Sequence, residues 1–287
     1  MHCYLAVNSS KDPNLAFSLQ LADYMERNGM QTSILEATKD SYGNYHFYFP
    51  PDNDAIVLVL GGDGTMLQCA NDLNLEGLCY PMLGINLGTL GFLTQVEKDD
   101  AFSAVDAVLQ GAYTLESYPL LSAQLHNERV DFCQQAFNDV VVGREGFARI
   151  LSLTVSIDGC LAYQAMCDGI LVSTALGSTA YNVSLGGPVV PPGTPALIVT
   201  PIAPHFPGLK PIVVPDSVEI AVQLNGGKGS QIREGLVTCD GRNNGIWLEA
   251  GDTVVIRKNA CGGQLLRLKN SQKDFFRVYR EKLLAGK

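Results

Sequence analysis

Residues 55–65 read AIVLVLGGDGT: a run of six apolar residues that ends in a glycine-rich turn. A continuous apolar run of this length is typical of a strand in a parallel sheet that is covered on both faces. The residues after the turn, 65–73, favour a helix. Glycines at a strand-to-helix turn let backbone N–H groups approach phosphate oxygens, and the helix N-terminus adds its positive end. We therefore predict a phosphate-binding loop at this turn.

The sequence on both sides of this turn alternates between strand and helix patterns. Repeated alternation of this kind favours an open, Rossmann-like α/β sheet. The predicted strands are 3–8, 31–37, 54–60 and 80–86, and the predicted helices are 12–28, 65–73 and 99–109.

After about residue 111 the pattern changes to short β-rich runs separated by glycine and proline, which indicates a mainly β domain. These runs are 117–125, 137–142, 150–157, 169–174, 196–201 and 217–223. A final amphipathic helix is predicted at 272–284. We expect it to pack back on the body, because its few apolar residues would give weak membrane affinity. The predicted domains are 1–112 (α/β, with the glycine turn), 113–262 (β-rich) and 263–287 (helical tail).

Composition restricts the possible partners. The formal charge of −9 argues against a surface that follows nucleic-acid phosphates or anionic lipid. Residues 1–8 (MHCYLAVN) lack the features of a secretory signal, and no apolar run is long enough to cross a bilayer. The eight cysteines and four histidines are dispersed, without zinc-site spacing. We expect a cytoplasmic protein with reduced thiols and no protein-ligated metal.

Asp63 is unusual inside a phosphate-binding turn, because its carboxylate repels the ligand that the glycines attract. The residue is explained if it accepts a proton from an attacking hydroxyl, or helps to place a Mg²⁺ ion carried by a nucleotide. The alternative is that Asp63 caps the following helix. The turn matches neither the G-x-G-x-x-G dinucleotide fingerprint, because Leu67 stands at the third glycine, nor a Walker loop.

Further segments along the chain carry motifs in a fixed order after the GGDGT turn. They are 84–94 (GINLGTLGFLT), 137–141 (FNDVV), 168–174 (DGILVST), 177–181 (GSTAY), 186–188 (GGP), 200–205 (TPIAPH), 211–215 (PIVVP) and 239–242 (CDGR). The GGDGT turn alone is similar to that of NAD kinases, of diacylglycerol and sphingosine kinases and, in a related form, of phosphofructokinases. Together with the other segments, it resembles the NAD kinase family.

This resemblance implies an enzyme that transfers the terminal phosphoryl group of ATP, of another nucleoside triphosphate or of polyphosphate to the adenosine-ribose 2′-hydroxyl of NAD. Mg²⁺ or another divalent cation would enter with ATP, and the enzyme would form a homodimer or homotetramer. Asp63 would be the catalytic proton acceptor. The implied binding residues are Gly61, Gly62, Gly64 and Thr65 around the donor phosphates, with Asn86, Phe92, Asn138, Asp139, Arg149, Asp168, Ser178, Thr179, Ala180, Tyr181, Asn182, Ser184 and Arg242 in the rest of the nucleotide site.

Several other interpretations remain open from the residues. Phe92 fits core packing nearly as well, the pair Asn138–Asp139 could be a turn before a strand, and Ser178 could be a nucleophile, although no G-x-S-x-G elbow surrounds it. The whole chain could also be a lipid kinase or a non-catalytic NAD or NADP sensor. Met166 and Gln68 depart from the family pattern, which leaves the preference between NAD and NADH and the donor contacts open.

Overall fold

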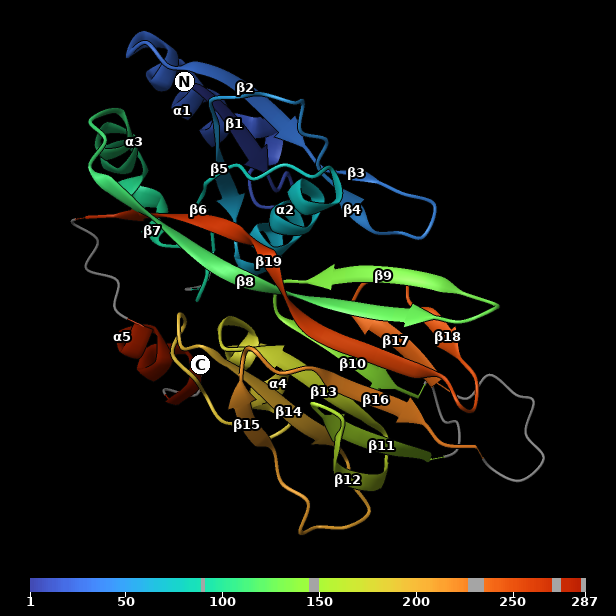
Figure 1. Ribbon diagram of the computed structural model, residues 1–287. Helices are drawn as coiled ribbons and strands as arrows, with labels where there is room; N and C mark the ends of the chain where they lie inside the picture. The colour runs from blue at the N-terminus through green and yellow to red at the C-terminus, as the bar shows by residue number, and fades with distance from the viewer. Residues whose placement is uncertain (89–90, 145–149, 227–234, 270–274, 285–287) are drawn as a thin grey trace. The chain divides into compact units, whose positions relative to one another are not determined.

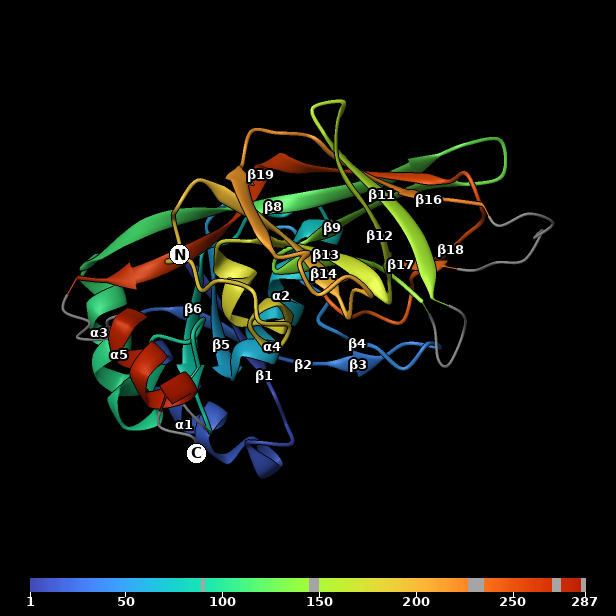
Figure 2. The ribbon, with the colours of Figure 1, turned by 90° about the horizontal axis from the view of Figure 1, so that it is seen from below.

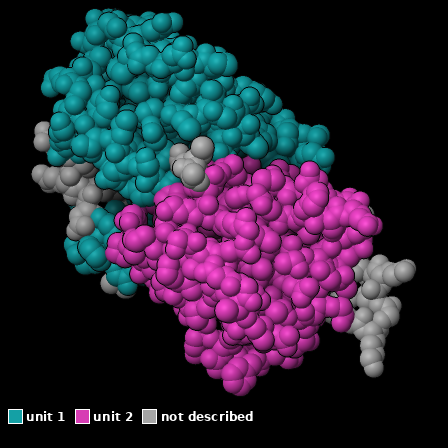
Figure 3. Space-filling view, viewed as in Figure 1, with its two compact units in different colours: residues 1–118, 263–287 teal, residues 119–262 magenta. Residues whose placement is uncertain are grey.

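The computed structural model describes residues 1–88, 91–144, 150–226, 235–269 and 275–284. The chain divides into two compact units, which Figure 3 colours separately. The first unit consists of Met1–Tyr118 with Gly263–Lys287, and the second of Pro119–Gly262. The chain passes from one unit to the other within two strands, β8 (Tyr113–His126) and β19 (Thr253–Leu268).

The first unit is built on a parallel sheet with the strand order β2-β1-β5-β6 (Figure 1). The strands are β1 (His2–Val7), β2 (Gln31–Glu36), β5 (Ala55–Gly61) and β6 (Met82–Asn86), and the short β7 (Val96–Glu97) pairs with β6. Every residue of β5 is buried, as expected for a strand covered on both faces. The predicted open α/β sheet is therefore confirmed.

Helices cover both faces of this sheet. α1 (Ala16–Arg27) and α3 (Ala101–Leu109) share one apolar core with side chains of β1, β5 and β6. α2 (Asp63–Leu75) packs on the other face, where Met66 lies against Gly84 of β6. Short 3₁₀ turns, η1 (Pro13–Leu15) and η2 (Lys98–Asp100), lead into α1 and α3.

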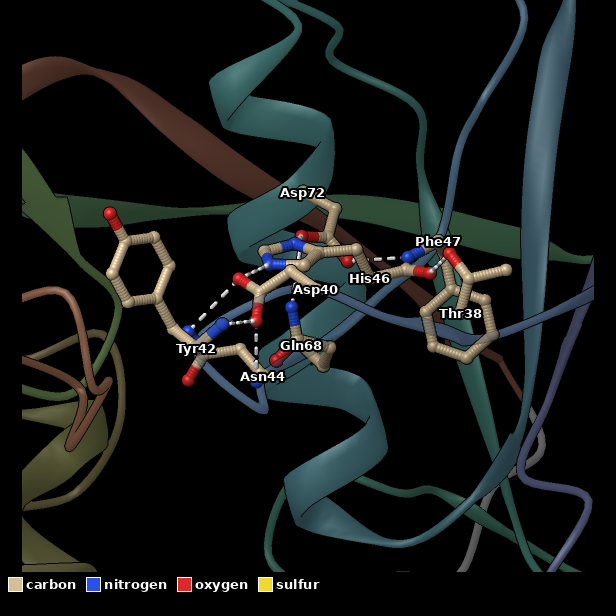
Figure 4. Close-up of polar contacts among 8 residues, drawn as sticks. All are labelled: Thr38, Asp40, Tyr42, Asn44, His46, Phe47, Gln68 and Asp72. Atoms are coloured by element: carbon tan, nitrogen blue, oxygen red, sulfur yellow. Dashed lines mark hydrogen bonds and ion pairs between the residues drawn. The ribbon is translucent and has the colours of Figure 1, made fainter.

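A small hairpin that the sequence patterns did not predict lies beside α2. It pairs β3 (Thr38–Lys39) with β4 (Tyr45–His46). Figure 4 shows the His46 ring between two carboxylates, with Nδ1 2.8 Å from Asp72 of α2 and Nε2 3.1 Å from Asp40 of the hairpin loop. His46 thus joins the hairpin to the helix that begins at the glycine turn.

The second unit consists of antiparallel strands in two layers, which confirms the prediction of a mainly β region (Figure 2). One layer has the order β12-β11-β16-β19, with β8 and β9 beyond β19, and the other has the order β15-β14-β13-β10-β17-β18. The strands not yet given bounds are β9 (Asp131–Ala136), β10 (Asp139–Gly143), β11 (Leu151–Ile157), β12 (Cys160–Cys167), β13 (Gly169–Thr174), β14 (Ala196–Ile202), β15 (Ile212–Pro215), β16 (Ile220–Leu224), β17 (Gly235–Cys239) and β18 (Ile246–Leu248).

Alternate residues of these strands form one core between the two layers, as in a β-sandwich. Val140 and Val172 contribute from one layer, and Leu153 and Val222 from the other. Two short helical turns, η3 (Leu176–Thr179) and α4 (Tyr181–Ser184), follow β13.

The C-terminal helix packs on the first unit, as predicted. It comprises α5 (Phe275–Tyr279) and a π-helical turn, η4 (Arg280–Leu284). Val278 is buried, and the ring of Phe275 lies 5.9 Å from that of Phe92. Within the described ranges, no helix combines the length and apolar character that a membrane span requires.

Candidate functional site

The glycine turn lies where β5 ends and α2 begins, so its backbone N–H groups sit at the positive end of a 13-residue helix. Gly61 must lack a side chain, since a Cβ there would overlap the hydroxyl of Thr65. That hydroxyl also accepts a hydrogen bond of 3.2 Å from Asn8, which follows β1. The turn therefore has the geometry of an anion-binding loop at the carboxyl edge of a parallel sheet.

Asp63 points away from the helix that it begins. Gly62 occupies the N-cap position of α2, and no side chain makes a capping hydrogen bond there. The Asp63 carboxylate instead accepts the N–H of Phe92 at 2.8 Å and that of Leu93 at 2.9 Å, in the turn after β6. The alternative that Asp63 is a helix cap is therefore wrong. Its carboxylate joins the two turns that follow β5 and β6.

The electrostatic environment keeps Asp63 ionised. Burial raises the pKa of Asp63, but hydrogen bonds from two backbone N–H groups and the positive charge of Lys282 outweigh it, so the pKa lies below its usual value. The side chain is 27% exposed. A Cβ at Gly91 would overlap the carboxylate, so this approach requires glycine.

Two other residues predicted from the 84–94 segment lie nearby: Asn86 is the last residue of β6, and Phe92 is in the turn that follows it. Asn86 is buried. Its side-chain amide donates to the Gly88 carbonyl and to the Glu97 carboxylate, the latter at 2.9 Å, and its amide oxygen accepts the N–H of Gly88. Phe92 is half-buried between Phe275 and the Lys282 ammonium, which lies 5.1 Å from its ring centroid. Asn86 thus shapes the turn, while Phe92 lies beside the Asp63 carboxylate.

Lys11 is a basic residue near this turn that the sequence patterns did not single out. It follows β1, and its ammonium lies so close to Gly62 and Gly88 that a Cβ on either would contact it. No ion pair connects Lys11 to a carboxylate in the part of the chain that the structure describes. Three neighbouring strand ends therefore place glycine N–H groups, one carboxylate and one lysine together.

The Asn138–Asp139 pair lies in the second unit, where β10 begins. Asp240, held at a φ of 52°, accepts the N–H groups of Phe137, Asn138 and Asp139 at 2.7, 2.8 and 3.1 Å. The pair is thus fixed by a carboxylate about a hundred residues further along the chain, and the patterns around Asn138 gave no sign of this. Burial and the nearby charge of Asp240 raise the pKa of Asp139 to about 7.

The segment from Gly177 to Ser184 contacts this pair through its glycine, because a Cβ at Gly177 would overlap the backbone of Asn138. Ser178 is fully buried, and its hydroxyl both donates to and accepts from the backbone of Val190, at 2.9 and 3.0 Å. A serine nucleophile is not supported by this geometry.

The rest of the segment divides into buried and accessible side chains. The amide of Asn182 is buried and bonds Ser178, Pro188 and Thr200. Side chains that are partly or fully accessible, and so able to meet a ligand, are those of Thr179, Ala180, Tyr181 and Ser184.

Asp168 lies between β12 and β13 and forms a two-pronged ion pair with Arg144, with N–O distances of 2.8 and 2.9 Å. Arg144 was not among the predicted residues. Arg149, which was, lies outside the described residues. Arg242 follows β17 in the same turn as Asp240.

The site offers little to a metal ion. Among the described residues, no three His, Cys, Asp or Glu side chains are grouped so that they could bind a metal. The oxygens of Asp63 receive N–H and ammonium donors. The residues therefore do not fit a Mg²⁺ ion held by the protein at Asp63, and such an ion would have to rely on nucleotide phosphates and water.

Two family models match the chain: the ATP-NAD kinase N-terminal domain over residues 24–113 and the ATP-NAD kinase C-terminal domain over residues 137–267. The chain is 35% identical to the NAD kinase of Lachnoclostridium phytofermentans over 285 residues, covering 98% of this chain and 97% of the relative. It is also 35% identical to the NAD kinase of Ruminiclostridium cellulolyticum over 289 residues, covering 98% and 96%.

Solved structures show the same fold. A yeast NADH kinase complexed with NADH superposes with a TM-score of 0.81 at 21% identity, covering 100% of this chain and 88% of the other. An NAD kinase from Archaeoglobus fulgidus in complex with ATP gives a TM-score of 0.75 at 24% identity, covering 98% and 99%. The two domain matches and the near full-length relatives show that this chain belongs to the ATP-NAD kinase family.

Proposed function

We propose that this chain is an NAD kinase, which transfers the terminal phosphoryl group of ATP to the 2′-hydroxyl of the adenosine ribose of NAD. Membership of the family supports the substrates. The observation that supports the chemistry is the Asp63 carboxylate, which is ionised, partly accessible and fixed inside an anion-binding turn.

In this proposal the donor phosphates bind at the glycine turn. N–H groups of Gly61, Gly62, Gly64 and Thr65 would meet the phosphate oxygens at the start of α2. The ammonium of Lys11, which lies over Gly62 and Gly88, would supply positive charge in a chain whose net charge is −9. A divalent cation carried with ATP would neutralise the phosphates further.

Asp63 would act as the general base. As the ribose 2′-oxygen forms a bond to the terminal phosphorus, the hydroxyl proton moves to the Asp63 carboxylate. The bond from that phosphorus to the bridging oxygen breaks, and its electron pair leaves with ADP. The Phe92 and Leu93 N–H groups would hold the carboxylate in position throughout.

The second unit would bind NAD. Asn138 and Asp139 would hydrogen-bond the ribose and adenine groups, and the accessible side chains of the Gly177–Ser184 segment would contact one end of the dinucleotide. Asp168, Arg149 and Arg242 complete the proposed nucleotide-binding residues, together with Asn86 and Phe92 of the first unit. We retain 1–112, 113–262 and 263–287 as the proposed domains, and a cytoplasmic homodimer or homotetramer as the proposed state.

The direct test incubates the purified protein with NAD, ATP and Mg²⁺ and measures NADP. Asp63→Asn keeps the shape of the side chain but removes the proton acceptor, so we expect kcat to fall by about 10²- to 10⁴-fold. Asp99→Asn, an exposed change in the same unit, serves as the control and should leave kcat unchanged. Panels with NADH as acceptor and polyphosphate as donor would define both substrates.

Each alternative predicts a different result. A lipid kinase would phosphorylate diacylglycerol or sphingosine and leave NAD unchanged. A sensor would bind NAD, measured by calorimetry, without forming NADP. Equal NADP formation by Asp63→Asn and the wild type, with both proteins folded by circular dichroism, would remove Asp63 from the mechanism.

A further inference from the structure

The Asp63 carboxylate has no lone pair left for a substrate. An ionised carboxylate offers about four acceptor positions. Its Oδ1 accepts from Leu93 at 2.9 Å and, more weakly, from Thr94 at 3.4 Å, and its Oδ2 accepts from Phe92 at 2.8 Å and from the Lys282 ammonium at 3.1 Å. A ribose hydroxyl can reach this base only if one donor leaves.

Only one of the four donors can leave without unfolding the turn. The three N–H groups belong to consecutive backbone residues that are fixed by the turn after β6. Lys282 is different, because its ammonium is carried on a flexible four-carbon side chain that is 38% exposed. The displaceable donor is therefore Lys282.

The C-terminal helix holds Lys282 in this place by more than one contact. The Lys282 ammonium lies over the ring of Phe92, the residue whose N–H also binds Asp63. Phe275, which is on the same C-terminal helical segment as Lys282, packs its ring against that of Phe92. Lys282 thus has an ion pair with Asp63 and a cation–π contact with Phe92, and Phe275 of the same helical segment packs on that ring.

We propose that Lys282 is a positioning residue for phosphoryl transfer: its ammonium occupies the Asp63 oxygen that the acceptor hydroxyl needs, and it moves to the phosphoryl group when donor and acceptor bind. This inference rests on the proposed function. The exchange makes no covalent bond, since the lysine gives up one anionic oxygen and gains another. In the free enzyme the Lys282 ammonium orients the Asp63 carboxylate. It also blocks access of the acceptor hydroxyl to this base until a phosphate is present to attract the ammonium.

The test compares Lys282→Met and Lys282→Arg with the wild type in the NADP assay. Methionine keeps most of the apolar stem but removes the charge, and we expect kcat to fall by about tenfold or more while the Kd for NAD, measured by calorimetry without donor, changes less than twofold. Arginine should restore part of kcat. Arg280→Met removes a neighbouring exposed charge from the same helical turn and should leave both quantities unchanged.

The pH profile separates positioning from simple packing. The Lys282 charge lowers the pKa of Asp63, and Asp63 must be ionised to accept the proton, so Lys282→Met should move the acidic limb of kcat/KM to higher pH. Identical kcat and identical acidic limbs in Lys282→Met and Arg280→Met would overturn the proposal. If instead the wild type forms no NADP, the proposed function itself fails, which is a distinct result.

Discussion

The burial of Asp139 makes its ionisation costly. Burial and the charge of Asp240 raise its pKa to about 7 in the folded chain, from 3.8 in the unfolded chain. The folded state therefore gains stability from protonated Asp139 below pH 4, and this stability is lost as the pH rises through 7. Such a group is typical of a binding site, where function is kept at the expense of stability.

Asp139→Asn should consequently stabilise the protein at pH 8 and not at pH 4. Each pKa unit corresponds to about 1.4 kcal/mol, so we expect at least about 1 kcal/mol at pH 8, or a rise in Tm of about 2–4 °C. Thermal unfolding monitored by circular dichroism at both pH values measures this. The same variant should raise KM for NAD. Asp131→Asn, on the exposed surface of the same unit, is the control. An equal shift at pH 4 would contradict the assigned pKa.

The glycine turn and its aspartate could be predicted because they are contiguous and follow an unmistakable buried strand. The orientation of Asp63 could not, because its partners lie 29 and 30 residues away, in the turn after the next strand. The contact of Lys282 with Asp63 could not be predicted either, because the two residues are 219 positions apart in the sequence. Asp240 belongs to the 239–242 motif, but its hydrogen bond to Asn138 could not be predicted, because it depends on the pairing of β10 with β17.

Among the strands and helices, those with a clear hydrophobic period were predicted with the correct type, as β5, β6 and α3 show. The β3–β4 hairpin was missed, because residues 38–46 (TKDSYGNYH) carry no apolar alternation. Its position depends on polar contacts to α2, which no local pattern reports. Gln68 of α2, which departs from the family pattern, donates to Asp72 at 2.9 Å within this cluster (Figure 4).

His46→Gln should weaken this attachment in a pH-dependent way. Burial lowers the pKa of His46, but hydrogen bonds to Asp72 and Asp40 outweigh it and raise the pKa above 6.5. The charged ring therefore contributes its full stability below pH 6.5, and the contribution is lost as the pH rises through the folded pKa. We expect Tm to fall by about 2–4 °C at pH 6, for a loss of about 1 kcal/mol, and by less at pH 9.

Scanning calorimetry across this range tests the effect. His126→Gln is the matched control, since His126 is 84% exposed and pairs with an exposed aspartate. A loss of Tm that is the same at every pH would show that the charge on His46 does not contribute.

The chain as a whole separates the two proposed substrate roles between two cores, and hydrogen exchange can test this division. ATP alone should slow exchange at residues 61–65 and leave residues 138–139 and 177–182 unchanged, because the donor phosphates are proposed to bind at the glycine turn. NAD should slow exchange at residues 138–139 and 177–182. Protection of these residues by ATP alone, to the same degree as by NAD, would contradict the assignment.

The order of the units along the chain has a consequence for biosynthesis. The second unit is one continuous segment, whereas the first combines the segments that precede and follow it. As the chain leaves the ribosome, Pro119–Gly262 can assemble its sandwich while the first unit still lacks the end of β19 and the helix that carries Lys282. Asp63 and Lys282 are 219 residues apart, so Asp63 can complete its hydrogen bonds only after the whole second unit has been synthesised.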